Sequence, residues 1–470
     1  MECEVVVVGA GIGGLTVAAL LAQRGVNVCV LERERQVGGC AAAFEKFGYT
    51  FEPGYGLFSG WKPDEIHHQI FAELPVDPPE VRACETPYVV RLPDASEIAL
   101  TSNQEEFQAN LRRVFPECWE KAVDFYARLE ATANALRRAD APSFPLTSTA
   151  DYLAGASLRF RRFIDVQLQT FAQAGSAEVS YGRAALALSA SRAGMWTIRG
   201  GAPALADRLA QSIKQSGGRI RLNTPVLRLA YDSTGSALGV DLLSGETVIA
   251  SKAIVSNLTL WDTYGKLVGL NRTPGEIRTL LKTLRGWGAY LIYVSLDQPI
   301  GASLPPDRVL SLSDWQEDQL NQSYAPENNQ LFFAAAPAWD ARAPDGKRAA
   351  TVHAFTGVDE WFNYHTDETQ LEQQDQHLLE ECWQRLHAAI PELGGSAEVI
   401  ETVTPRGYYE TTRRKLGMVG GVIPSLAADT LTPAWQTALP NLFIVSDTAS
   451  AGNIEALSQA AWALAERLTR

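Results

Sequence analysis

Length, composition and charge set the first limits on this chain. Its 470 residues, 46% of them hydrophobic and 20% charged, are enough for two or three domains at about 100–200 residues each. This balance, without a low-complexity tract, excludes an intrinsically disordered chain. The net charge of −13 argues against nucleic acid as a partner.

The first glycine-rich turn predicts a dinucleotide-binding fold. A buried strand over residues 4–8 runs into the turn at residues 9–14 (Gly-Ala-Gly-Ile-Gly-Gly), and a helix follows. In such a turn Gly9 permits the tight bend, Gly11 lets the backbone approach a pyrophosphate, and Gly14 lets the helix pack on the strand. The free N–H groups at the helix N-terminus then face the phosphates.

The second strand favours FAD over NAD. Residues 26–31 form another apolar run, and Glu32 at its end is placed to accept hydrogen bonds from ribose hydroxyls. Arg33 comes next, and Gly38-Gly39 follows six residues after the acid. These glycines let a second loop pass close to an extended cofactor, a feature of flavoproteins of the glutathione-reductase and amine-oxidase type. We therefore expect FAD.

A loop rich in glycine and aromatic residues comes next. Residues 47–58 read as a strand and then a tight loop, in which Gly54 and Gly56 let the chain run against a flat ring. Glu52, just before this loop, is the nearest candidate for a general base. The favoured interpretation of Glu52 is a structural carboxylate at the end of the strand, so no residue is assigned as catalytic.

A helix over residues 62–74 carries His67 and His68. We interpret these histidines as a capping or solvated pair, because no third ligand lies at a spacing that suits a metal ion. No metal is therefore expected. The segments that follow predict strands over 85–100 and long helices over 103–138 and 157–190.

The second half of the chain again alternates between strands and helices. The expected elements are a helix entered at 199–203 and ending near 216, a strand and turn over 219–229, a hairpin of 237–243 and 247–250, and a buried strand over 253–257. The other domain then takes a strand over 289–296, apolar segments over 330–336 and 349–356, and a helix over 368–390.

The C-terminal segment predicts a second cofactor contact. A strand over residues 439–447 ends on Asp447, a turn of small residues follows, and a helix begins at Ile454. The Asp447 carboxylate can accept a hydrogen bond from a ribityl hydroxyl. The helix N-terminus near Gly452 can point at the flavin pyrimidine oxygen and stabilise the negative charge of reduced flavin.

These elements predict an α/β protein with two interleaved domains. One is a Rossmann-like FAD-binding domain of the glutathione-reductase/amine-oxidase type, and the other is a discontinuous mixed α+β substrate domain. We assign residues 1–75, 196–270 and 405–470 to the FAD-binding domain, and residues 76–195 and 271–404 to the substrate domain. The candidate cofactor-binding residues are Gly9, Gly11, Gly13, Gly14, Glu32, Arg33, Gly38, Gly39, Cys40, Gly54, Tyr55, Gly56, Val226, Asn257, Asp447, Asn453 and Ile454.

Cysteine usage and hydropathy bear on the compartment. The six cysteines show no CxxC pair, which indicates a reduced, cytoplasmic protein. We expect neither a signal peptide nor a spanning helix, because no apolar run approaches about 18 residues. Residues 158–164 mix Arg159, Arg161 and Arg162 with apolar side chains. This segment could lie in a lipid headgroup layer, making the protein peripheral on a membrane, or it could pack on its own domain.

Taken together, these segments resemble the bacterial-type phytoene desaturase family of FAD enzymes, which also includes carotenoid isomerases and retinol saturases. Within that family the sequence is closest to the cyanobacterial carotenoid 3,4-desaturase-like branch. Two places depart from the family pattern: residues 446–453 lack its His-Pro pair, and Gly54-Tyr55-Gly56 replaces its usual loop. The stretches that carry the closer likeness are residues 58–68, 163–168 and 416–421.

The resemblance implies a lipophilic substrate, a carotenoid or a related polyisoprenoid. It implies desaturation in which the flavin accepts a hydride and a proton leaves the neighbouring carbon. Two alternatives stay open: a carotenoid cis-trans isomerase that uses reduced flavin, and an amine-oxidase-like flavoenzyme. The sequence does not fix the bond attacked, the final electron acceptor or the oligomeric state.

Overall fold

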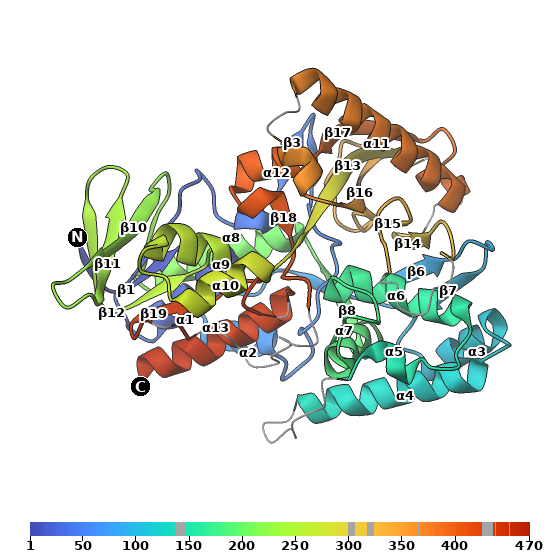
Figure 1. The fold of residues 1–470 in the computed structure, drawn as a ribbon, viewed down its shortest axis with the longest axis horizontal. Helices are drawn as coiled ribbons and strands as arrows, with labels where there is room; N and C mark the ends of the chain where they lie inside the picture. The colour runs from blue at the N-terminus through green and yellow to red at the C-terminus, as the bar shows by residue number, and fades with distance from the viewer. Residues whose placement is uncertain are drawn as a thin grey trace.

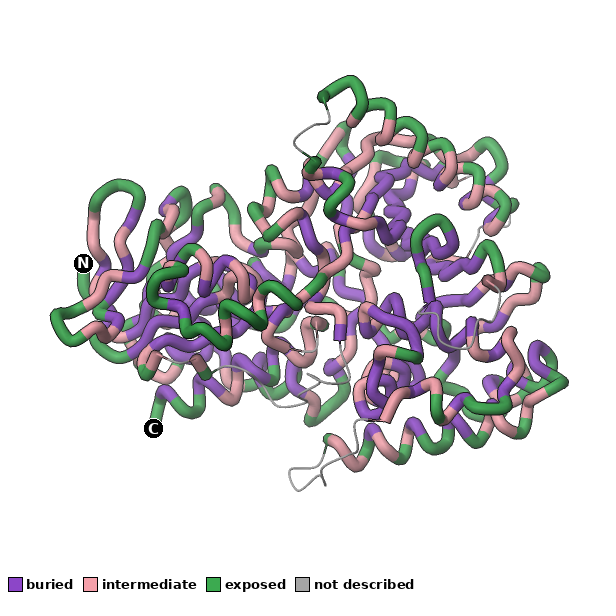
Figure 2. The backbone as a smooth tube through the Cα atoms, in the orientation of Figure 1, coloured by how far each residue is buried: buried purple, intermediate pink, exposed green. Residues whose placement is uncertain are grey.

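The computed structural model describes every residue except 138–146, 299–305, 317–323, 364–366, 425–435, 438 and 451. The described chain builds two large β-sheets with helices on both faces of each (Figure 1). Buried backbone is concentrated in these sheets and in the helices next to them, whereas the outer sides of the long peripheral helices are exposed (Figure 2).

The first sheet confirms the predicted Rossmann-like unit. Strand β1 pairs in parallel with β2, aligning Val5 with Val28, and in parallel with β12, aligning Val7 with Val255. In the described residues the strands run in the order β10 (Val226–Tyr231), β11 (Ala237–Leu242), β12 (Thr247–Ser256), β1 (Glu2–Val8), β2 (Val28–Leu31) and β9 (Arg219–Arg221), with β19 (Leu442–Ile444) beside β12.

Helix α1 (Ile12–Gln23) is buried nearly all round, because its small and apolar residues are covered on several sides. One face of the first sheet packs with α1 in a single apolar core. The other helices of this core are α2 (Ile66–Glu73), α8 (Gly201–Gln215) and α13 (Ile454–Thr469). The opposite face is covered in part by α9 (Leu260–Asp262), the π-helix η2 (Thr263–Gly269) and α10 (Gly275–Thr283).

The second sheet builds the other half of the molecule. Along β13 the side chains alternate: Tyr290 and Ile292 pack toward α11, whereas Leu291 and Tyr293 face the opposite side. Its order over the described residues is β17 (Ala397–Val403), β13 (Trp287–Asp297), β16 (Lys347–Thr356), β15 (Gln330–Ala335), β14 (Arg308–Leu312), β6 (Tyr88–Arg91) and β7 (Glu97–Leu100), with β18 (Met418–Val419) beside β13.

Helices cover both faces of this second sheet. Helix α11 (Glu368–Ala389) lies on one face (Figure 1), where the Tyr290 hydroxyl donates to Asp375 at 2.5 Å. The other face packs on α3 (Gln104–Val114), α4 (Trp119–Leu136), α5 (Thr149–Tyr152), α6 (Leu158–Ala172) and α7 (Tyr181–Ala193). The remaining named elements include the ribbon of β3 (Phe44–Lys46) with β4 (Tyr49–Phe51), the ribbon of β5 (Val81–Cys84) with β8 (Met195–Ile198), and α12 (Pro405–Thr412).

Several expected boundaries were wrong, each for a local reason. The helix expected over 103–138 is two helices, because Pro116 disfavours helical backbone at Phe115 and α3 ends there. The helix expected over 157–190 breaks where Gln173 adopts φ +69°. The strands expected at 247–250 and 253–257 form a single strand, β12. Its pairing with β1 shifts register between the two halves, and the strand continues across this irregularity.

The two sheets draw on the chain in the alternating manner predicted for the two domains. The domain boundaries themselves stay predictions; β18, within the segment assigned to the FAD-binding domain, pairs with the second sheet. In the described ranges, no helix combines the length and the apolar character needed to cross a bilayer.

Candidate functional site

A cavity of about 880 Å³ lies between the two sheets. Ligand pockets in proteins are typically about 300–1,000 Å³, so it is large enough for an extended ligand. All the candidate cofactor residues line this cavity except Gly13 and Gly14. Residues from both ends of the chain and from its middle therefore meet at one site. Contact between these residues and FAD stays a prediction.

The glycines of the first turn leave room where another residue would collide. A Cβ at Gly14 would lie closer than 3.0 Å to the Gly9 carbonyl oxygen, and one at Gly13 would lie 2.8 Å from Leu457 of α13. Both glycines therefore serve packing around α1. A Cβ at Gly39 would lie 3.1 Å from the Gly11 Cα, so the second glycine loop passes directly over the first turn.

Glu32 directly follows β2 as a buried carboxylate with 8% of its surface exposed. It accepts hydrogen bonds from the backbone N–H groups of Ala10, at 2.6 Å, and Glu34, at 2.9 Å. Two oxygens offer about four acceptor positions, so the carboxylate can still accept from ribose hydroxyls. The fixed carboxylate, the glycine turn and the start of α1 fit the nucleotide half of an FAD.

Asp447 forms an ion pair that the sequence analysis missed. Arg414 Nη1 lies 3.0 Å from Asp447 Oδ2, and the same guanidinium donates to the carbonyls of Met418, at 2.8 Å, and Gly420, at 2.9 Å. Burial alone would lower the pKa of Arg414, but Asp447, Cys40 and other neighbours raise it well above its usual value. Arg414 thus fixes both the Asp447 carboxylate and the backbone of β18 and of the residue that follows it. No motif in the sequence marks it.

Helix α13 begins at the cavity, as the sequence predicts. Asn453 is its N-cap, with a side chain that accepts a hydrogen bond from the Ala456 N–H at 2.8 Å, and Ile454 lines the cavity. The positive end of this helix therefore faces the cavity, where it can stabilise negative charge. Ala451, in the turn before it, lies outside the described residues.

Glu52 makes the contacts expected of a structural carboxylate, and its assignment as one stays a prediction. Only 9% of its surface is exposed. One oxygen accepts from the Ala202 N–H at 3.0 Å, and the other lies 2.9 Å from Arg342 Nη1, which is itself paired with Asp340. Glu52 therefore ties the loop at residues 53–56 to the start of α8, and both of its oxygens are engaged.

Toward the second sheet the cavity becomes an apolar chamber. The chamber lies between β13 and β16 on one side and α6 and α7 on the other. We define it by the apolar residues Leu57, Phe171, Leu186, Ala190, Met195, Leu291 and Phe355, together with Tyr55, Thr170, Gln173 and His353. Burial lowers the pKa of His353 to about 3, so its imidazole is neutral at physiological pH.

Tyr55 belongs to the chamber rather than to the nucleotide end. Its ring centroid lies 4.4 Å from that of Phe332 and 4.8 Å from that of His353, and the edge of Phe171 is also near. Burial raises the pKa of Tyr55. The Gly54–Gly56 loop therefore joins the nucleotide end of the cavity to the chamber.

The interpretation of His67 as a capping or solvated residue was wrong. His67 has 2% of its surface exposed and stacks on Trp61, with ring centroids 4.7 Å apart. Burial lowers its pKa to about 3. In the part of the chain that the structure describes, no cluster of three potential ligands could hold a metal ion.

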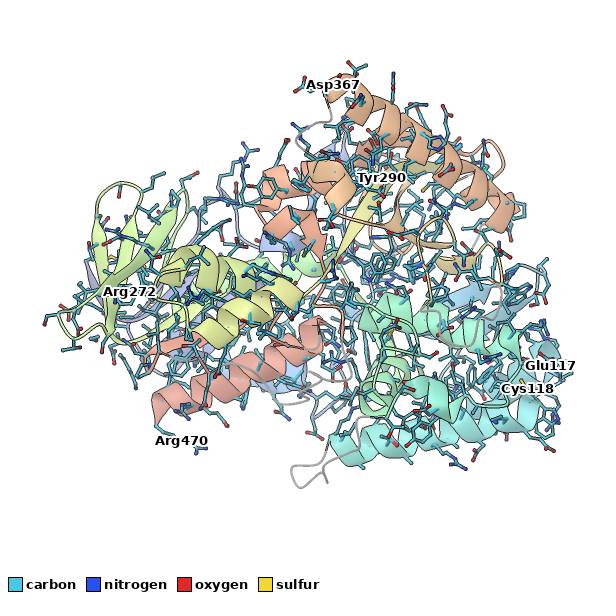
Figure 3. The ribbon with its side chains drawn as sticks, viewed as in Figure 1. Glu117, Cys118, Arg272, Tyr290, Asp367 and Arg470 are labelled. Carbon is cyan, nitrogen blue, oxygen red and sulfur yellow. The ribbon has the colours of Figure 1, made fainter. Side chains whose placement is uncertain are left out.

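The segment at residues 158–164 packs on its own domain. Phe160 and Ile164 are fully buried, so they are unavailable to a lipid layer. Arg162 pairs with Asp165 at 2.9 Å. Arg159 pairs with Asp94 and with Glu117, which lies in the turn between α3 and α4 and is labelled in Figure 3. The lipid interpretation of this segment was therefore wrong; peripheral membrane contact through another surface stays a prediction.

Comparisons with known proteins agree with this geometry. The family described as flavin containing amine oxidoreductase matches residues 12–459. The chain is 26% identical to all-trans-retinol 13,14-reductase of Danio rerio, over 94% of this chain and 82% of that protein. It is also 26% identical to chloroplastic prolycopene isomerase of Arabidopsis thaliana, over 96% of this chain and 79% of that protein.

Among solved structures, an oxidoreductase from Methanosarcina mazei shares the fold, with a TM-score of 0.69 at 17% identity over 99% of this chain and 100% of that chain. The family match and this fold confirm the predicted fold class, and the family match confirms the predicted cofactor, FAD. The chain belongs to the family of flavin containing amine oxidoreductases, and the protein is an FAD-dependent oxidoreductase.

Proposed function

We propose that this enzyme acts on a carotenoid or a related polyisoprenoid and desaturates it by hydride transfer to the flavin. The observation that carries the proposal is the apolar chamber, which continues directly from the predicted cofactor residues in one cavity. The proposal also follows the resemblance to the carotenoid 3,4-desaturase-like branch.

The chamber residues suit a long hydrocarbon. Side chains such as Phe171, Leu291 and Phe355 remove substrate surface from water, which contributes roughly 25 cal/mol per Å² of apolar surface buried. When bound, FAD would accept the hydride that leaves one substrate carbon, while the neighbouring carbon gives up a proton to the solvent. The start of α13 supports the negative charge that this transfer delivers. Glu52, with both oxygens engaged, holds the loop that lies between the two parts of the cavity.

An amine substrate fits the chamber less well. An alkyl amine is an ammonium ion at neutral pH, and burying a charge without a partner is costly. No carboxylate is among the residues that define the chamber, and Arg137, which also lines the cavity, carries a positive charge that would repel an ammonium ion. This favours a polyisoprenoid over an amine.

A second candidate function is cis-trans isomerisation of a carotenoid with reduced flavin. It is supported by the relative from Arabidopsis thaliana, whose printed name is prolycopene isomerase. The same chamber would hold the polyene, and no net oxidation would occur.

Anaerobic flavin reduction separates these activities. The holoenzyme, purified in detergent, is mixed without oxygen with a panel of carotenoids and with a panel of alkyl amines, and the visible flavin absorption is recorded. A desaturase loses this absorption with a carotenoid whose own bands move to longer wavelength. An isomerase leaves oxidised flavin unchanged and converts the carotenoid only after the flavin has been reduced. Bleaching by amines alone would contradict the proposal.

A further inference from the structure

Positive charge gathers on η2, on α10 and in the short segments that follow them. Residues 263–286 hold five cationic side chains and one acidic side chain, Glu276, although the whole chain has a net charge of −13. The five cationic residues are all exposed: Lys266, Arg272, Arg278, Lys282 and Arg285. Lys266 pairs with Asp262 at 2.7 Å. Within the described part of the chain the other four form no ion pair, so their charge is free to meet an outside partner.

Elements η2 and α10 cover the same face of the first sheet, and their apolar side chains point toward it. Val268 of η2 is buried in the core beneath, and Ile277 and Leu281 of α10 pack against that core. Hydrogen bonds hold both elements down: the Tyr231 hydroxyl donates to the Val268 carbonyl at 3.0 Å, and Trp261 Nε1 donates to the Leu281 carbonyl at 3.0 Å. The other sides of η2 and α10 therefore point away from the sheet, into solvent.

Two exposed leucines stand among the cationic side chains. Leu270, directly after η2, has 58% of its surface exposed, and Leu280 of α10 has 39%. At about 3.6 residues per turn, Arg278 and Lys282 lie along one flank of α10 and Leu280 along the other. No residue of α10 is buried. We call these two leucines and the five cationic residues the basic surface.

We propose that the basic surface docks the enzyme on a bilayer that contains anionic lipids. Charge complementarity supports this partner, because each arginine or lysine near an anionic membrane surface strengthens binding roughly fivefold. The leucines can enter the boundary between headgroups and acyl chains, as on interfacial amphipathic helices. The outer sides of two helices form a convex surface, which a bilayer accommodates without a matching hollow. Lys266 also lines the cavity, so the cavity reaches the docked surface.

Vesicle flotation of the FAD-loaded enzyme tests this inference. The vesicles contain phosphatidylcholine alone, or phosphatidylcholine mixed with phosphatidylglycerol, which is anionic. We expect at least about tenfold tighter binding to the mixed vesicles, and a loss of this preference in high salt, which screens exposed charges. Arg278→Glu/Lys282→Glu should reduce binding to the mixed vesicles at least about tenfold, and Leu270→Ser/Leu280→Ser should reduce it severalfold.

The matched control is Arg208→Glu/Lys214→Glu, which makes the same change in net charge on α8. Both residues are exposed, and α8 packs on the opposite face of the first sheet. This variant should bind the mixed vesicles nearly as tightly as the unmodified enzyme. All variants are compared at equal flavin content, which shows that each remains folded.

Equal binding to both kinds of vesicle, or no binding to either, would overturn the inference. Unchanged binding in Arg278→Glu/Lys282→Glu would also overturn it, as would an equal loss in the α8 control, because overall charge would then govern binding. Binding of soluble polyglutamate to the basic surface, without binding to vesicles, would assign it to an acidic protein instead. Carotenoid-dependent flavin reduction in detergent needs no bilayer, so the proposed function is judged separately from all of these results.

Discussion

The turn at Gly11 offers a quantitative test of how the cofactor end is built. Its φ is −73°, so alanine is not excluded by backbone strain. A Cβ there would instead lie closer than 3.0 Å to the side-chain oxygen of Asn257. The Nδ2 of the same side chain donates a hydrogen bond to the Val445 carbonyl at 2.5 Å. Overpacking costs about 1–3 kcal/mol, and losing that hydrogen bond adds about 1 kcal/mol. Gly11→Ala should therefore lower the free energy of unfolding by about 2–4 kcal/mol.

A second substitution separates the two roles of Gly11. Asn257→Ala removes the colliding oxygen, so the apo form of the double variant Gly11→Ala/Asn257→Ala should be about as stable as Asn257→Ala alone. The methyl group still occupies the path of the pyrophosphate. We therefore expect FAD affinity to stay at least tenfold low in both variants that contain Gly11→Ala, and to fall less than tenfold in Asn257→Ala.

The assay combines urea unfolding of the apoprotein with titration of FAD by flavin fluorescence. Full recovery of FAD affinity in the double variant would refute the reasoning, because Gly11 would then be needed only to make room for Asn257. Unchanged stability in Gly11→Ala would refute the steric part.

Three further predictions concern residues around the cavity. Arg414→Met removes the partner of Asp447 and the two hydrogen bonds to the carbonyls of Met418 and Gly420, so FAD content after dialysis should drop more than tenfold; an unchanged content would show that the ion pair does not position the site. Glu52→Gln should lower the free energy of unfolding by about 1–3 kcal/mol through its contact with Arg342, yet keep the rate of flavin reduction per bound flavin; loss of that rate would restore Glu52 as a catalytic candidate. For His67, whose pKa falls from 6.5 to about 3 on folding, the unfolded chain binds the proton first as the pH drops below 6.5. Its contribution to stability therefore falls by about 1.4 kcal/mol per pH unit below pH 6 until the pH nears 3. His67→Phe should reduce the loss of unfolding free energy between pH 7 and pH 5. The same loss in the variant as in the unmodified protein would contradict the lowered pKa of His67.

The cofactor end could be predicted from sequence because its signals are local. Gly9 has φ +97° at the turn, Gly14 meets the turn's own backbone, and Glu32 directly follows its strand. Each of these features depends on neighbours a few residues away, so spacing alone identifies them.

The chamber could not be predicted because it depends on which surfaces meet. His353 and Gln173 are far apart in the sequence, and only the register of β16 and the end of α6 bring them to one space. Arg414 reaches Asp447 in the same way. The apolar face of residues 158–164 was visible in the sequence, but periodicity does not say whether lipid or protein covers it.

The proposed desaturation is tested most directly by weighing the product of a single anaerobic turnover. The holoenzyme is mixed with a stoichiometric amount of the carotenoid that bleaches its flavin, and the extracted polyene is analysed by chromatography and mass spectrometry. The account predicts one product molecule, lighter by two hydrogen atoms and carrying one more double bond, for each flavin reduced. A product of unchanged mass and altered geometry, formed without flavin bleaching, would contradict it and establish isomerisation instead.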